Sequence, residues 1–358
     1  MTILLYPPDK SQDARLYRFL FDALKRHSGA RMASGIRPLP RLEYPRQHES
    51  VWIEWEGVRI LLDMSDHIFL FDLPALRICD VYFKANLNQR MAEKVLAKAG
   101  AMDCLPKIRP FLFLPPEPVN CYRIEKATRL IRKRSWRPLD FCHVVGVYDN
   151  PFLEGLPPEA AKDVVADIGV NHFWVRYQIQ QALQRTGMKG ICRLTNRGNA
   201  ELLDAQGVVR PNLSNGIFLL AMLASRMTVI NTLPHAIFPW KAMESVALGI
   251  PFVVERRPLI VMPKALELIP GQHYLELLPE LPGFDESAGP DDLLAYRLYP
   301  EIRLERLRER AEWLKGEIHN ANHMGEMRAE VDAYCRRLLN TEYIANHFIE
   351  TALQAVEK

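Results

Sequence analysis

Three polar residues in the first half of the chain, Asp63, Asp66 and His67, have side chains suited to proton transfer. They follow a predicted strand, and a carboxylate at the carboxyl end of a strand can take the proton from an attacking hydroxyl group. We expect Asp66 to act as this general base, with His67 and Asp63 as alternates. The competing interpretation is structural, in which Asp66 caps a turn and Asp63 is a solvated strand end.

Lys84 comes directly after Val81-Tyr82-Phe83, an apolar run that is typical of a buried strand. We expect its ammonium group to reach the surface along its extended side chain. Contact with a substrate phosphate is the alternative.

A second set of polar residues lies between residues 226 and 255, where we predict a strand, a loop, a short helix and another strand. Pro239 stands where the helix begins, and Gly249 and Pro251 stand where it ends. Lys241 and Glu244 are three residues apart, so they share one face of this helix and should point together into a cleft.

This segment resembles the carboxyl-terminal donor-binding domain of glycosyltransferases with the GT-B fold. That domain carries a helix reading E-A-x-A-x-G-x-P, and four residues stand at the matching offsets here: Glu244, Ala247, Gly249 and Pro251. Ser245 replaces the first alanine with another small residue. Outside residues 226–255 only the order of the elements agrees with the family.

The resemblance implies a nucleotide-binding site. Glu244 would bind the nucleotide ribose, the helix N-terminus would face the pyrophosphate, and Lys241 would add positive charge beside the phosphates. His235, in the loop before the helix, belongs to the same expected site. Ala236 stands where retaining members often carry a second glutamate, and residues 235–239 replace a glycine-rich loop. These differences leave inverting and divergent families open.

The implied function is transfer of a sugar from a nucleotide-sugar to a glycan, a lipid-linked sugar or a small molecule. The nucleotide-sugar is a donor substrate, so no bound cofactor is expected. No metal site is expected either, because no D-x-D motif lies on a suitable loop. Two alternatives remain: a non-catalytic GT-B-like protein that binds or assembles with a partner, and a nucleotide-sugar 2-epimerase. An ordinary helix that only packs between two strands also fits the pattern.

Strand-like and helix-like segments alternate along most of the chain, which is typical of α/β layers. We predict two Rossmann-like domains facing across a cleft, as in the GT-B fold, with C-terminal helices crossing back. The predicted acceptor domain covers residues 1–137, the nucleotide-sugar domain 138–325 and the returning helix 326–358.

Local patterns add three expectations about the elements. Residues 51–55 and 58–63 should form a hairpin around a Glu-Gly turn. The proline-rich stretch 258–300 should consist of loops and turns, and residues 327–354 should form one helix.

Residues 123–137 contain seven basic side chains and one acidic side chain, with apolar residues interleaved. This segment would either lie on an anionic membrane surface or form the solvated face of a connector between domains. Nucleic-acid binding is disfavoured, because 46 basic and 43 acidic side chains leave a net charge of only +3.

The composition, 48% hydrophobic and 25% charged, is that of a folded protein. No apolar run approaches the roughly 20 residues that span a bilayer, and the N-terminus lacks the basic region of a signal peptide. The six cysteines form no C-x-x-C pair, so neither a disulfide framework nor a zinc site is expected. We therefore expect a cytoplasmic protein, which lipid binding by residues 123–137 would place at the inner face of the membrane.

Overall fold

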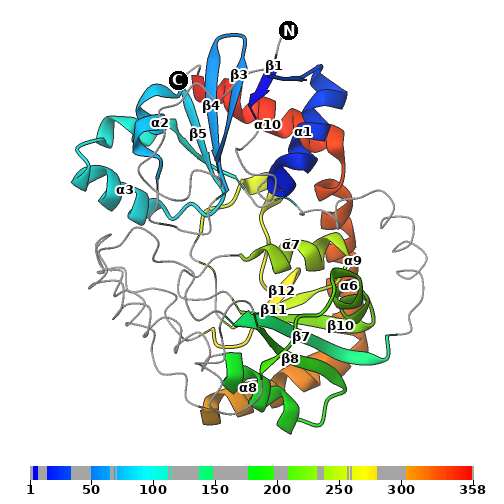
Figure 1. Cartoon of the computed structure of the whole chain (residues 1–358). Coiled ribbons are helices and arrows are strands. Elements are labelled where there is room, and N and C mark those ends of the chain that lie inside the picture. Colours follow the sequence, from blue (N-terminus) through cyan, green and yellow to red (C-terminus); the bar gives the residue numbers. More distant parts are fainter. Residues whose placement is uncertain are drawn as a thin grey trace.

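The computed structural model describes residues 3–6, 14–33, 50–64, 68, 71–111, 114, 137–147, 176–196, 209–231, 238–255, 258, 260–279 and 304–356. Of the predicted site residues, Asp66, His67 and His235 lie outside these ranges, as do residues 123–136 of the basic segment. Within them the chain forms two β-sheets covered by helices, followed by three C-terminal helices (Figure 1).

The first sheet is mixed. Its strands are β1 Ile3–Tyr6, β2 Arg31–Met32, β3 Ser50–Trp55, β4 Val58–Asp63, β5 Val81–Lys84 and β6 Ile108–Pro110, in the order β2-β1-β3-β4-β5-β6. Strand β3 runs antiparallel to β1 and β4, whereas β4, β5 and β6 are parallel. Between β3 and β4, Glu56 and Gly57 have φ angles of 47° and 88°. The predicted hairpin is therefore confirmed.

Different helices cover the two faces of this sheet, because apolar side chains alternate along its strands. The helical elements are α1 Ala14–Ser28, α2 Leu73–Ile78, α3 Gln89–Lys98 and the 3₁₀ helix Met102–Lys107. In β4, Ile60 and Leu62 join the apolar cluster of α1, whereas Leu61 between them joins the cluster of α2 and α3.

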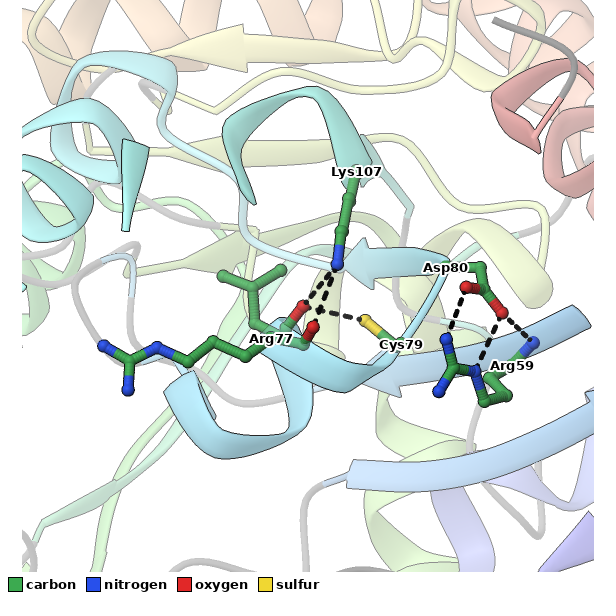
Figure 2. A network of polar contacts seen from close by, with 6 residues as sticks. Arg59, Arg77, Cys79, Asp80 and Lys107 are labelled. Carbon is green, nitrogen blue, oxygen red and sulfur yellow. Dashed lines mark hydrogen bonds and ion pairs between the residues drawn. The ribbon is translucent and has the colours of Figure 1, made fainter. Parts of the chain in front are cut away.

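Polar contacts join the elements at the amino ends of β4 and β5 (Figure 2). The Arg59 guanidinium donates to both carboxylate oxygens of Asp80 at 2.8 and 3.0 Å, and these hydrogen bonds lower the pKa of the Asp80 carboxyl. Lys107 Nζ donates to the carbonyls of Leu76 and Arg77 at 3.3 and 3.1 Å, where α2 ends. Because these contacts lie at the edge opposite the carboxyl ends of the strands, we assign them a structural role.

The second sheet has six parallel strands: β7 Leu139–Val147, β8 Gly190–Asn196, β9 Val209–Arg210, β10 Ser225–Ile230, β11 Phe252–Val254 and β12 Tyr274–Glu276. Their order, β12-β11-β10-β7-β8-β9, is that of a Rossmann fold. The chain moves outward from β7 in one direction and then from β10 in the other, so the order reverses between β7 and β10.

Helices cover both faces of the second sheet. One face packs against helix 176–185 and α8 Leu304–His319, and the other against α6 Asn215–Leu223 and α7 Trp240–Ala247. Helix α7 ends before Gly249, whose φ of 66° is the left-handed conformation that terminates a helix.

Strand β12 corrects one prediction, because it lies in the stretch 258–300 that we expected to hold only loops and turns. Its Tyr274 ring stacks on Phe252 of β11 with 5.3 Å between the ring centroids. Leu275 packs in the same apolar cluster as Val253. At 3 residues the strand is too short for alternation to stand out among the prolines.

The C-terminal helices cross back to the first domain, as predicted (Figure 1). Helix α9 (Ala321–Leu338) packs on α7 and α8, and α10 (Thr341–Val356) packs on α1 and β5. The Phe348 ring lies 4.8 Å from the Phe83 ring between centroids. The domain boundaries near residues 137 and 325 stay predictions.

The prediction of a single helix over residues 327–354 is wrong. The chain breaks between α9 and α10, where Asn340 Oδ1 accepts from the backbone N–H groups of Glu342 and Tyr343 at 3.0 and 3.1 Å. This contact caps the N-terminus of α10. The spacing of apolar residues does not reveal the break between the two helices, because apolar residues recur at helical intervals both before and after Asn340.

Candidate functional site

Strands β7 and β10 separate at their carboxyl ends. Their registered pairs run from Leu139 and Ser225 to Cys142 and Thr228, although β7 continues to Val147 and β10 to Ile230. Ligands of open α/β sheets bind outside the carboxyl ends of the strands, at the point where the strand order reverses. A ligand site is therefore expected where β7 and β10 separate.

Three side chains bind backbone carbonyls where the two strands separate. Lys241 Nζ of α7 donates to the carbonyl of Val144, and an Arg176 guanidinium N–H donates to the carbonyl of Gly146. His143 Nδ1 lies 3.1 Å from the carbonyl oxygen of Val229. Side chains thus satisfy carbonyl groups that the β7–β10 ladder does not reach.

The His143 side chain is fully buried in this region. Because a carbonyl only accepts, Nδ1 carries the proton, and Nε2 is an acceptor with no hydrogen-bond partner among the described residues. Burial, together with the charges of Lys241 and Arg176, lowers the pKa of His143 to about 4. His143 is therefore neutral near pH 7.

A pocket of about 410 Å³ opens at the carboxyl ends of β7 and β8. Among the described residues it is lined by Val144, Gly146, Thr195, Asn212, Leu213, Phe218 and Lys241. The Lys241 ammonium lies 5.2 Å from the centroid of the Phe218 ring. The volume is that of a small-molecule site, and its lining combines a cation, an aromatic ring, an amide and a hydroxyl.

The structure places the two predicted residues of α7 on one side of the helix. Lys241 lines the pocket, and Glu244 lies one turn further along and is half-buried. Glu244 is not among the described lining residues. Ala242, Met243 and Val246 lie on the opposite side of α7 and pack on the sheet. Ser245, at the edge of this buried surface, donates from Oγ to Thr228 Oγ1 at 2.9 Å.

In the first domain, Asp63 and Lys84 form a buried ion pair. They are register partners on the parallel strands β4 and β5, so their side chains lie next to each other. Asp63 Oδ2 accepts from Lys84 Nζ at 2.9 Å and from Tyr82 Oη at 2.6 Å. Burial, followed by the charge of Asp63, raises the pKa of Tyr82.

This arrangement corrects two structural expectations. Lys84 was expected at the surface, but its exposed fraction is 0%, and Asp63 is buried rather than a solvated strand end. The prediction failed because the apolar run before Lys84 does not show that a carboxylate lies beside it on the next strand. Asp66 as the general base, with His67 and Asp63 as alternates, stays a prediction.

Sequence reasoning missed a group of buried polar residues at the carboxyl ends of the strands of the second sheet. Arg176, Asn231 and Glu255 are joined by hydrogen bonds of 3.0 and 3.1 Å. Asn231 and Glu255 each come directly after a strand of a parallel sheet. That position is the signal that could have identified them, because the carboxyl ends of parallel strands meet at one edge.

The described residues contain no group of three or more His, Cys, Asp or Glu side chains arranged to hold a metal ion. None of their helices combines the length and the apolar character needed to cross a membrane.

No protein-family model matches the chain, and no curated protein sequence matches it significantly. Among solved structures it is similar to a glycosyltransferase from Rickettsia africae, with 9% identity over 78% of this chain and 64% of that chain and a TM-score of 0.39. It is also similar to the structure of accessory secretory proteins 1, 2 and 3 from Streptococcus pneumoniae, with 9% identity over 80% and 44% and a TM-score of 0.34. For the catalytic domain of starch synthase IV from Arabidopsis thaliana, the identity is 11% over 74% and 57%, with a TM-score of 0.29.

The chain therefore covers less than two thirds of each of these solved chains. The strand order and the helix packing show the fold. Two Rossmann-like domains with C-terminal helices crossing back form the arrangement that the resemblance to GT-B glycosyltransferases implies.

Proposed function

We propose that this protein is a glycosyltransferase that moves a sugar from a nucleotide-sugar donor to a glycan, a lipid-linked sugar or a small molecule, without a metal ion. The observation that carries the proposal is the pocket beside the separation of β7 and β10, with Lys241 in its lining. A cation in a pocket at the reversal point of a Rossmann sheet suits a phosphorylated ligand.

The donor would be held mainly by α7. The Lys241 ammonium would exchange the Val144 carbonyl for a phosphate oxygen, which carries more negative charge. The N-terminus of α7 begins one residue earlier, and its backbone N–H groups favour phosphate. Glu244, one turn along the helix, would accept hydrogen bonds from the ribose hydroxyls.

The first domain would hold the acceptor and the base. In an inverting transfer, the base takes the proton of the acceptor hydroxyl while that oxygen bonds to the sugar carbon. The bond from the same carbon to the nucleoside phosphate breaks, and the phosphate leaves with the bonding electrons. We assign the base to Asp66, with His67 and Asp63 as alternates.

A thermal-shift screen against UDP, GDP, CMP and dTDP tests the proposal directly. A nucleotide at 100 times its dissociation constant stabilises the folded protein by about 2.7 kcal/mol. Stabilisation by one nucleotide is expected. No response to any of them would favour the non-catalytic alternative, and conversion of the donor without an acceptor would favour an epimerase.

The Glu244→Ala variant tests the assigned ribose contact. Loss of a charge-assisted hydrogen bond removes roughly 1.5–3 kcal/mol, so nucleotide affinity should fall about tenfold to a hundredfold in a variant that still folds. Glu309→Ala is the control, because Glu309 is an exposed residue of α8 that pairs with Arg306. Calorimetric titration showing equal affinity for Glu244→Ala and the unmodified protein would contradict the assignment.

A further inference from the structure

A chain of buried polar side chains joins three connections of the second sheet. Arg176 Nε donates to Asn231 Oδ1 at 3.0 Å, and Asn231 Nδ2 donates to Glu255 Oε1 at 3.1 Å. Arg176 lies in helix 176–185 after β7, whereas Asn231 and Glu255 directly follow β10 and β11. Their exposed fractions are 6, 4 and 1%. These three buried side chains therefore link three βα connections, and they are shielded from solvent.

The partners of Asn231 fix the orientation of its amide. Its carbonyl oxygen must face the guanidinium, which only donates, and its NH₂ group must face the carboxylate, which only accepts. Neither an aspartate nor an aliphatic side chain at this position can do both. The amide thus connects a buried cation to a buried anion, and breaking such a connection is strongly unfavourable.

These polar side chains connect the end of β7 to the end of β10, which backbone ladder hydrogen bonds do not connect. Ladder pairing between β7 and β10 ends at Cys142 and Thr228, so side chains must hold the strand ends beyond this point. Arg176 binds the carbonyl of Gly146 near the end of β7 and continues to Asn231 at the end of β10.

The pocket lies next to these polar residues, because Gly146, whose carbonyl Arg176 binds, also lines it. Asn231 begins the connection that leads to α7, and Lys241 of that helix binds the carbonyl of Val144. A shift of β10 against β7 would therefore move Lys241 relative to the pocket.

We propose that Asn231 and Glu255 are positioning residues. Through Arg176 they hold the end of β10 against the end of β7, and this spacing places the Lys241 ammonium in the pocket. Neither of them is among the described residues that line the pocket, so they act through Lys241. The contact of Lys241 with a donor phosphate rests on the proposed function, whereas its placement requires no ligand.

The test compares acetylation of Lys241 by an amine reagent, followed by peptide mass spectrometry, in the full chain and its variants. N231D keeps an acceptor for Arg176 but sets a carboxylate against Glu255. We expect acetylation of Lys241 to become about tenfold faster in N231D, which corresponds to a loss of about 1.4 kcal/mol. Adding E255Q supplies an amide opposite the new carboxylate and should restore the original rate. If N231D does not fold, N231S takes its place, because it removes both contacts without adding charge and should show the same faster acetylation of Lys241.

Two controls separate positioning from general destabilisation. Lys107 in the first domain, which binds the carbonyls of Leu76 and Arg77, should be acetylated at the same rate in every variant. D140N changes a buried residue at the amino end of β7, where Asp140 accepts from the Lys189 N–H at 2.9 Å. It should leave Lys241 unaffected even if it lowers the melting temperature.

Equal acetylation of Lys241 in the unmodified protein and in N231D or N231S would overturn the proposal, as would a failure of E255Q to restore the rate. Titration with inorganic pyrophosphate is the second measurement, and N231D should bind it about tenfold more weakly than the unmodified protein and the double variant do. If acetylation changes as expected but the unmodified protein binds neither pyrophosphate nor any nucleotide, the positioning stands and the proposed function fails.

Discussion

Replacing His143 with glutamine should remove a large part of the acid sensitivity of the second domain. The imidazole is fully buried between β7 and β10, and its Nδ1–H donates to the carbonyl of Val229. Glutamine can donate to the same carbonyl but does not titrate. The substitution therefore separates the protonation of residue 143 from its packing.

The magnitude follows from the pKa of His143, which burial lowers from 6.5 to about 4. The unfolded chain binds the proton at the higher pH, so the free energy of unfolding is highest above about pH 6.5 and falls as the pH drops towards 4. The slope reaches about 1.4 kcal/mol per pH unit for one proton, and the whole loss is about 3 kcal/mol.

Urea unfolding of the unmodified protein and of His143→Gln, measured at several pH values from about 7 to about 4.5, gives both slopes. The slope of the free energy of unfolding against pH should be smaller in the variant by the contribution of one proton. Cys142→Ala is the control, because it trims a buried side chain of the same strand without removing a group that titrates between about pH 4.5 and about pH 7, so the slope should stay that of the unmodified protein. Identical slopes for His143→Gln and the unmodified protein would refute the reasoning, as would an NMR titration showing a charged imidazole at position 143 near pH 6.

Three further substitutions test other parts of the molecule. Lys84→Met should lower the free energy of unfolding by about 3–5 kcal/mol, because it leaves the buried Asp63 carboxylate without its cation; chemical denaturation would show this, and adding Asp63→Leu should recover most of the loss. Arg59→Ala should cost only about 0.2–1 kcal/mol, because the Arg59–Asp80 pair is solvent-exposed, and a melting temperature lowered as far as in Lys84→Met would contradict this. Asp66→Asn should keep nucleotide binding and reduce kcat by at least about 10²-fold, and near-normal turnover would exclude Asp66 as the base.

Most elements of the two domains could be predicted from the sequence because their signals are local. Strand β7 is a nearly continuous apolar run and β11 is wholly apolar, since helices cover both faces of a parallel sheet. Helix α7 begins after Pro239 and ends before Gly249, and both residues act on the backbone of their own segment. Strand β12 was missed because three residues among prolines carry too little pattern.

The polar contacts could not be predicted in the same way, because they join residues that are distant in the sequence. The Lys84 ammonium is buried only because parallel register places Asp63 beside it, 21 residues earlier in the chain. Asn231 lies 55 residues from Arg176 and 24 from Glu255, and strand order alone brings the three together.

The sequence by itself determined the alternation of strands and helices, the ends of α7, and the placement of Lys241 and Glu244 on one side of it. These features depend on backbone preferences and side-chain spacing within a segment. The tertiary structure decided that β7 and β10 separate at their carboxyl ends, which carbonyls Lys241 and Arg176 bind there, and where a pocket opens. The physical reason is that strand pairing and the burial of charge depend on which segments meet in space, and local spacing does not contain that information.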